Sequence, residues 1–197
     1  MTKEHYSPWG CKHSFILASG SKARLRLLQM AGFEPEAVIP ANIDETPHKK
    51  ELPPRYVHRM AYEKAKAVAE KNPGKYILSA DTVIAVGIRM IRKATSKEQA
   101  IENLKLLSGR KHRVVTGFCI IKPDGKAIIK TVTTYVIIKK LDHVDIQAIL
   151  DSNEWQNVCG YQIEGILSAV VRKTIGSYPN VVGLPIFEVS QVLRGIL

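Results

Sequence analysis

Apolar and polar positions alternate along this chain with two different periods. Stretches that are continuously apolar, or apolar at every second position, predict strands at 15–18, 37–40, 76–86, 114–121, 127–139 and 167–172. Apolar residues at helical spacing predict five helices, which begin after Ser21, at Tyr56, after Ser96, at Asp142 and at Pro185, the last in the first helical position. Strands and helices that alternate in this way predict a mixed α/β fold.

Turn and cap residues support several of these boundaries. Ser96 and Gln99 match a capping box, and Gly109 stands where a C-cap glycine belongs. The Pro-Asp-Gly sequence at 123–125 predicts a hairpin turn between two long strands. The segment 41–54 is polar and bounded by prolines, which predicts a loop of the kind that often carries function.

The segment Leu-Ala-Ser-Gly-Ser-Lys-Ala-Arg at 17–24 joins the first strand to the first helix. Ser21 is a candidate N-cap, and three cations, Lys22, Arg24 and Arg26, follow it. The positive end of a helix dipole disfavours each cation by about 0.3 to 1 kcal/mol, whereas a phosphate is stabilised there. The segment is therefore a candidate phosphate site that includes Arg24. The alternative is a solvated first turn whose cations point into water.

Five further charged residues could carry chemistry. Asp81 lies within an apolar strand, where an ionised carboxylate is tolerated only if it is paired, hydrogen-bonded or bound to a metal. Lys64, on the apolar stripe of the second helix, and Lys93 could bring ammonium groups to phosphates. Asp44 and Glu45, in the polar loop, could hold Mg²⁺ through oxygen ligands. The alternatives are a structural aspartate at a strand end, snorkelling lysines and a solvated acidic loop.

Composition narrows the class of protein. The chain has 197 residues, of which 45% are hydrophobic and 24% charged, enough for one sizeable domain or two small lobes. Three widely spaced cysteines, Cys11, Cys119 and Cys159, favour free thiols in the cytoplasm over a disulfide framework or a zinc site. Because no apolar leader and no long apolar run is present, we expect neither secretion nor membrane spanning.

The net charge of +11 and the isoelectric point near 9.6 favour polyanionic partners. The cations are spread along the chain, however, without a basic stripe, a zinc-finger spacing or a helix-turn-helix pattern. A nucleoside triphosphate substrate explains the charge as well as DNA does. We therefore do not expect nucleic-acid binding to be the main function.

Several short motifs follow one another in order: 17–24, Ile43-Asp44-Glu45, Ala61-Tyr62-Glu63-Lys64-Ala65, Ala80-Asp81-Thr82, Lys93, Leu107-Ser108-Gly109, Val115-Thr116-Gly117, Gly160-Tyr161-Gln162-Ile163-Glu164-Gly165, Gly176-Ser177 and Asn180-Val181-Val182-Gly183-Leu184-Pro185. In this order and at this spacing they resemble the Maf family of nucleoside triphosphate pyrophosphatases. The resemblance covers 16–197, which is essentially the whole chain.

The resemblance implies an inosine-triphosphatase-like fold, with an elongated mixed sheet, flanking helices and a cleft between two lobes. Residues 15–197 would form this single domain of two lobes, and 1–14 a poorly ordered extension. It also implies a cytoplasmic homodimer that hydrolyses dTTP, UTP or a modified nucleotide to the monophosphate and pyrophosphate. A divalent cation, Mg²⁺, Mn²⁺ or Co²⁺, would be required.

Matched residue by residue, the resemblance assigns roles to positions of this chain. Asp81 corresponds to the catalytic aspartate, which would take a proton from the attacking water. The positions implied to bind substrate are Ser19, Ser21, Arg24, Lys64, Thr82, Lys93 and Glu164. Glu45 corresponds to an acidic position near the metal, with Asp44 as the fallback.

Three features depart from the family pattern, one of which is that the usual lysine before Gly160-Tyr161 is missing, since the chain has Asn157-Val158-Cys159 there. Ala23 stands where many relatives have an arginine. Glu164 stands where relatives that act on dTTP and UTP commonly have glutamine, whereas a sister group that acts on 7-methyl-GTP has glutamate but lacks the Asp81-Thr82 pair. Hydrolysis of 7-methyl-GTP is therefore one alternative function, and non-catalytic regulation of cell division is another. For Glu164 itself, the structural alternative is a solvent-facing side chain or an ion pair with Arg172.

Overall fold

A computed structural model describes residues 9, 13–91, 93–156 and 162–197. Within these residues seven strands form one mixed sheet, in the order β2-β1-β3-β5-β6-β7 with β4 beside β3. The strands are β1 (Phe15–Leu17), β2 (Ala37–Val38), β3 (Tyr76–Val86), β4 (Arg89–Ile91), β5 (Lys111–Ile121), β6 (Ala127–Ile138) and β7 (Val171–Ile175). Strand β1 pairs in parallel with β2 and β3, and the remaining pairs are antiparallel. The mixed α/β fold expected from the sequence is confirmed.

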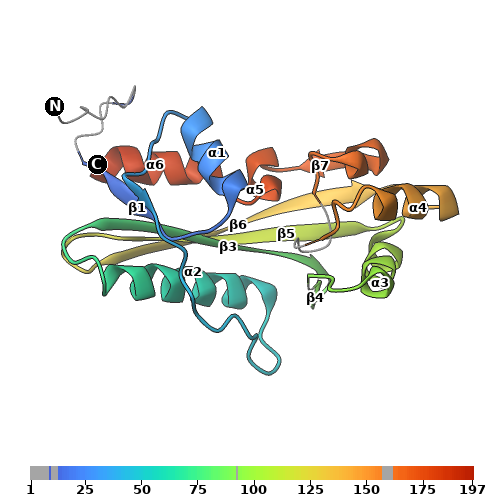
Figure 1. Ribbon diagram of the computed structural model, residues 1–197, viewed down its shortest axis with the longest axis horizontal. Helices are drawn as coiled ribbons and strands as arrows, with labels where there is room; N and C mark the ends of the chain where they lie inside the picture. Colours follow the sequence, from blue (N-terminus) through green and yellow to red (C-terminus); the bar gives the residue numbers. More distant parts are fainter. Residues whose placement is uncertain (1–8, 10–12, 92, 157–161) are drawn as a thin grey trace.

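Helices cover both faces of this elongated sheet (Figure 1). They are α1 (Lys22–Met30), α2 (Pro53–Ala69), α3 (Lys97–Leu107), α4 (His143–Asp151), α5 (Tyr178–Val182) and α6 (Ile186–Ile196), with a 3-10 helix, η1, at Ile166–Val170. Helix α2 packs on one face, while α1, α5 and α6 lie over the other. Each face therefore has its own apolar core, one around Leu17, Phe118 and Leu193 under α1 and α6, the other around Ala61 and Cys119 under α2.

One glycine allows α2 to approach the sheet closely. A Cβ atom on Gly117 of β5 would lie 2.3 Å from the carbonyl oxygen of Val57 on α2, so no larger residue fits there. Gly117 is the direct partner of Asp81 in the ladder between β5 and β3. The close approach therefore brings α2 down onto the sheet at the level of Asp81, and Lys64 lies two helical turns after Val57.

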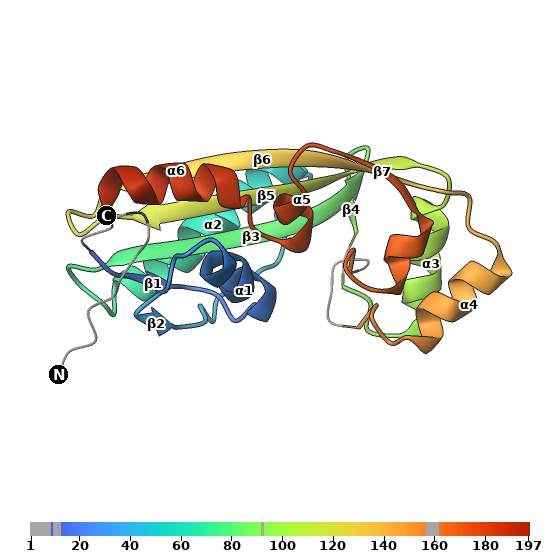
Figure 2. The same cartoon turned by 90° about the horizontal axis from the view of Figure 1, so that it is seen from above.

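The other end of the sheet carries a separate group of elements, in which α3, α4, η1 and β4 gather beside the ends of the long strands (Figure 2). Its core includes Leu104, Leu107, Ile138 and Leu167. Ser96 caps α3 as predicted, since its Oγ accepts from the Gln99 amide at 3.4 Å, but the Gln99 side chain accepts from Thr95 and not from the Ser96 amide, so the described contacts form only half of the predicted capping box. The helix start predicted at Asp142 is confirmed. Asp142 and Asp145 form a capping box at the start of α4, and Gly109 takes a positive φ of 70° directly after the cap of α3.

Several predicted boundaries differ from the structure. Helix α2 begins at Pro53 rather than at Tyr56, and β5 begins at Lys111 rather than at Val114. The strand expected at 167–172 is η1 followed by β7, because Leu167 and Val170 are both buried at the three-residue spacing of a 3-10 face. Pro185 is the N-cap of α6 rather than its first residue, since its ψ of 80° is not helical. The turn expected at 176–180 continues into the short helix α5.

Parts of two predicted segments lie outside the described residues. In the extension 1–14 these are 1–8 and 10–12, while the described Trp9 stacks on Phe33 with ring centroids 6.3 Å apart. In the tyrosine-containing loop they are 157–161, which include Cys159, Gly160 and Tyr161. No helix among the described residues is long and apolar enough to cross a membrane.

Candidate active site

A cavity of about 750 Å³ opens beside the middle of β3 and is walled by the β1–α1 turn, the loop before α2 and residues 162–164. This volume is within the usual range for small-molecule sites. Every predicted site residue except Asp44 lines it: Ser19, Ser21, Arg24, Glu45, Lys64, Asp81, Thr82, Lys93 and Glu164. Asp44 is exposed outside the cavity, where its Oδ1 accepts a hydrogen bond from the Thr46 amide at 2.9 Å.

The β1–α1 turn forms one wall and folds as the sequence predicts. Ser21 is the N-cap of α1, and its Oγ accepts from the Arg24 amide at 3.4 Å. The Ser21 amide donates to Ser19 Oγ at 3.3 Å. These contacts fix a tight turn at the positive end of the α1 dipole, which is a favourable place for an anion.

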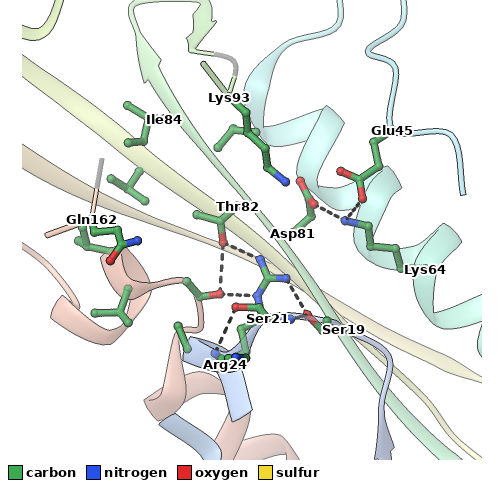
Figure 3. Close-up of a pocket in the computed structure, with 18 of the residues that line it drawn as sticks. Ser19, Ser21, Arg24, Glu45, Lys64, Asp81, Thr82, Ile84, Lys93 and Gln162 are labelled. Atoms are coloured by element: carbon green, nitrogen blue, oxygen red, sulfur yellow. Dashed lines mark hydrogen bonds and ion pairs between the residues drawn. The ribbon is translucent and has the colours of Figure 1, made fainter. Parts of the chain in front are cut away.

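The Arg24 side chain turns back across this wall and does not extend into water. Its guanidinium donates to Ser19 Oγ at 3.0 Å, to the carbonyl oxygen of Gly183 at 2.9 Å and to Thr82 Oγ1 at 3.2 Å (Figure 3). The three acceptors come from the β1–α1 turn, from β3 and from the end of α5. The guanidinium is thereby held in one orientation at the cavity wall, and the alternative of a solvated first turn is wrong for Arg24.

Lys64 joins two carboxylates across the cavity. Its Nζ lies 2.6 Å from Asp81 Oδ1 and 2.8 Å from Glu45 Oε1. Lys64 and Asp81 are both buried, with 8% and 6% of their surfaces exposed. Two alternatives from the sequence are therefore wrong: Lys64 does not snorkel, and Asp81 does not end its strand, since β3 continues to Val86.

The loop that delivers Glu45 is fastened to α2 by two side chains. Tyr56 Oη donates to the Glu45 carbonyl oxygen at 2.9 Å, and Arg59 donates to the Thr46 carbonyl oxygen at 3.2 Å. Arg59 also binds both carboxylate oxygens of Glu51, at 2.8 and 2.6 Å, and these hydrogen bonds lower the pKa of Glu51 to about 2. The loop is therefore tied to α2 at these points, while most of its residues, Asp44 and Glu45 among them, stay exposed to solvent.

The cations around Glu45 keep it ionised. Partial burial would raise its pKa, but the hydrogen bond from Lys64 and the charges of Lys64, Lys93 and Arg24 outweigh burial, so the pKa lies below its ordinary value. Lys93, just after β4, extends its amino group into the same space (Figure 3). This end of the cavity thus combines two carboxylates with three cations, a set of groups suited to a polyphosphate and to proton transfer.

The opposite end of the cavity is less charged. Ile84 and the Gln162 side chain lie at this end (Figure 3), and four further lining residues belong to the same apolar cluster as Ile84: Val114, Ile163, Val181 and Val182. At the rim, the Glu164 carboxylate pairs with Arg26 of α1. One alternative expected from the sequence was an ion pair between Glu164 and Arg172, whereas the structure pairs Glu164 with Arg26.

The carboxylates set a limit on metal binding. Glu45 and Asp81 present oxygen atoms within reach of one ammonium group, and carboxylate oxygens are the ligands that Mg²⁺ takes together with substrate phosphates. Within the described parts of the chain, no three His, Cys, Asp or Glu side chains gather as a cation cage. The donor set fits an ion that is shared with a phosphate substrate, and does not fit an ion held by protein alone.

Comparison with known proteins is consistent with this geometry. A family model described as Maf-like protein matches residues 14–196. A dTTP/UTP pyrophosphatase from Paramagnetospirillum magneticum is 48% identical over 181 residues, which cover 91% of this chain and 95% of that protein. The chain belongs to the Maf family. A second dTTP/UTP pyrophosphatase, from Caulobacter vibrioides, is 43% identical over 184 residues, covering 93% of this chain and 95% of that protein.

The fold expected for a Maf protein is also found among solved structures. A HAM1 protein from Coxiella burnetii superposes with a TM-score of 0.51 at 16% identity, covering 93% of this chain and 99% of that one. This likeness concerns the fold alone. It confirms the inosine-triphosphatase-like architecture that the motif order implied.

The sequence of this Maf chain predicted Ser19 and Thr82 as site residues, but it did not reveal the other contacts that hold Arg24 and Glu164 in place. Gly183 and Thr116 were part of the motif order, but their positions in the sequence did not reveal that Gly183 accepts from Arg24 or that Thr116 contacts Thr82. Gln162 belonged to a motif and Arg26 to the cations of the first helix, but neither position in the sequence showed that Gln162 lines the cavity or that Arg26 pairs with Glu164. These contacts depend on long-range packing.

Proposed function

We propose that this Maf protein is a nucleoside triphosphate pyrophosphatase that hydrolyses dTTP and UTP to the monophosphate and pyrophosphate. The observation that carries the proposal is the Lys64 ammonium held between Asp81 and Glu45 at the cationic end of the cavity. The relatives named dTTP/UTP pyrophosphatase, which are 43 to 48% identical over more than 90% of the chain, support the substrate class.

The two ends of the cavity suggest how the substrate lies. The triphosphate would occupy the cationic end, bound by Ser19, Ser21 and Arg24 of the turn and by Lys64 and Lys93 opposite. The base would occupy the end lined by Ile84 and Val182, with Glu164 at its rim. Charge-assisted hydrogen bonds to phosphate oxygens fix the phosphorus atoms in place, so positioning would supply much of the catalysis.

The hydrolytic step is a displacement between the α- and β-phosphates. A water molecule attacks phosphorus, Asp81 takes the proton that the water loses, and the bond to the bridging oxygen breaks. The products are a nucleoside monophosphate and pyrophosphate. Lys64, Lys93 and Arg24 would offset the negative charge that develops in the transition state. Thr82 would contribute through Arg24, because the Thr82 hydroxyl accepts a hydrogen bond from the Arg24 guanidinium.

Glu45 and Asp81 are the residues that would hold a divalent cation, with Mg²⁺, Mn²⁺ and Co²⁺ as the candidates. Such an ion would stabilise charge on the phosphate oxygens as a Lewis acid. Asp44, which lies outside the cavity, would not take part. The homodimer and the cytoplasmic location stay predictions from the family resemblance.

The proposed function is tested with a panel of nucleoside triphosphates assayed for pyrophosphate release with each of the three metals. We expect the highest kcat/KM with dTTP and UTP and no release without metal. A preference for 7-methyl-GTP would replace the substrate assignment. Binding of nucleotide without turnover under every condition would instead favour a regulatory protein.

A further inference from the structure

Arg24 is positioned by a buried polar network that reaches far outside the cavity. The acceptor for Arg24 Nε is the carbonyl oxygen of Gly183, the residue that ends α5. Gly183 has a φ of 129°, a backbone conformation that residues other than glycine rarely adopt. In this conformation its carbonyl oxygen accepts hydrogen bonds from both Arg24 and Thr82. The orientation of the guanidinium therefore depends on where α5 lies.

Helix α5 has five residues, too few to be stable in isolation, so its position must come from contacts with the rest of the fold. Asn180, in the middle of α5, is completely buried. Its Nδ2 donates to the Val114 carbonyl oxygen of β5 at 3.2 Å and to Thr134 Oγ1 of β6 at 3.0 Å. One side chain thus ties α5 to the two long central strands.

The same network continues through the backbone to the cavity. Thr134 Oγ1 accepts from the Ser177 amide at 3.1 Å and donates to the Ser177 carbonyl oxygen at 3.1 Å, which fixes the residue that caps α5. Thr116 Oγ1 lies 2.9 Å from Thr82 Oγ1 and donates to the Asn180 carbonyl oxygen at 3.4 Å. Hydrogen bonds therefore run from Asn180 to the wall that holds Arg24.

We propose that Asn180 is a positioning residue for the phosphate site, acting through α5 and the Gly183 carbonyl to orient the Arg24 guanidinium. Asn180 is not among the residues that line the cavity, so its effect would be indirect. The inference rests on the proposed function only in taking Arg24 as a ligand of phosphate. It deepens that function by naming what fixes the geometry of the guanidinium fork.

The test is a double-mutant cycle with inorganic pyrophosphate as the ligand and calorimetry as the readout. Asn180→Ala is made in the wild-type chain and in Arg24→Lys. Lysine keeps the positive charge but lacks the planar guanidinium, whose N–H donors are fixed relative to one another. The position of the Gly183 carbonyl oxygen therefore no longer sets the direction of the donors that face the ligand. We expect Asn180→Ala to weaken binding at least fivefold with Arg24 present and less than twofold with Lys at this position.

Ser108→Ala is the matched control for a loss of stability alone. Ser108 Oγ accepts from the Leu141 amide at 2.8 Å at the far end of the sheet, away from the cavity. We expect this variant to lower the melting temperature and to change pyrophosphate affinity less than twofold. If Asn180→Ala does not fold, Thr134→Val takes its place in the cycle, because it removes one acceptor of Asn180 while keeping the shape.

Equal weakening by Asn180→Ala in both backgrounds would overturn the inference, since the effect would not pass through Arg24. Absence of pyrophosphate binding by the wild-type chain would overturn it as well. Failure of the proposed function would look different: pyrophosphate would bind and the cycle would show coupling, but no triphosphate would be hydrolysed.

Discussion

The Lys64 ammonium lies 2.6 Å from the Asp81 carboxylate, and both side chains are buried between α2 and the sheet. Each would be costly to bury alone, because removing one partner of a buried ion pair leaves an uncompensated charge. Glu45 gives the same ammonium a second partner at 2.8 Å. A buried pair at the wall of a cavity is poised to exchange its mutual contact for contacts with a charged ligand.

Asp81→Asn tests the role of the carboxylate as a base. The amide keeps the shape of the side chain and loses its basicity, so we expect kcat to fall by about 10²- to 10⁴-fold while nucleotide still binds. Turnover is measured as pyrophosphate release, and binding by calorimetry. Turnover within about threefold of the wild type would exclude Asp81 as the base. A protein that fails to fold would favour a structural role for this aspartate.

The cations at the phosphate end are tested by Lys64→Ala and Arg24→Ala. We expect each substitution to lower kcat/KM, with a loss of transition-state stabilisation of about 2 to 4 kcal/mol, because each removes a charged donor from a partly desolvated site. Lys71→Ala and Lys139→Ala remove the same charge from positions that do not line the cavity. If these controls lose as much activity as Lys64→Ala, the effect is general attraction by the net charge and not a specific site.

The Glu51–Arg59 pair predicts how stability depends on pH. The pKa of Glu51 is lowered from 4.5 to about 2 in the folded protein, so its contribution is complete above about pH 4.5 and is lost as the pH falls toward 2. At pH 7 we expect Glu51→Gln to lower the free energy of unfolding by about 1 to 3 kcal/mol. The melting temperatures of the wild type and of Glu51→Gln should converge near pH 2. A difference that stays constant over this range would contradict the assignment.

Glu164 tests recognition of the base. A glutamine amide offers a donor and an acceptor to a pyrimidine, whereas a carboxylate offers acceptors only. We therefore expect Glu164→Gln to shift kcat/KM toward dTTP and UTP, relative to dCTP, by about 1 to 3 kcal/mol. Arg26→Ala breaks the same ion pair but keeps the carboxylate, so it should leave the ranking unchanged. An unchanged ranking with Glu164→Gln would place this residue at the rim without contact to the base.

Much of the fold could be predicted from local pattern. The limits of β3, the hairpin of β5 and β6, and the N-caps Ser21, Ser96 and Asp142 depend on neighbouring residues, and all are found in the structure. The 3-10 helix η1 and the short helix α5 could not be predicted in this way, because their conformation depends on burial against distant strands. The short apolar run 167–172 fits a strand and a 3-10 turn equally well.

The residues of the candidate site likewise fall into those that could be predicted from the sequence and those that could not. Asp81 and Lys64 stand out in the sequence because a charge interrupts an apolar pattern, and their placement against each other follows from the packing of α2 on β5. The support for Arg24 could not be predicted, since Gly183 and Asn180 lie more than 150 residues along the chain from it and carry no charge. Only the tertiary fold brings α5 against the phosphate turn.

The central claim is that this Maf protein cleaves between the α- and β-phosphates of a pyrimidine nucleoside triphosphate at the Asp81 and Lys64 site. The most direct test is phosphorus NMR of dTTP incubated with Mg²⁺ and either the wild-type protein or Asp81→Asn. We predict resonances of dTMP and pyrophosphate in equal amounts with the wild type, and unchanged dTTP with the variant. Formation of dTDP and inorganic phosphate, or equal turnover by both proteins, would contradict the account.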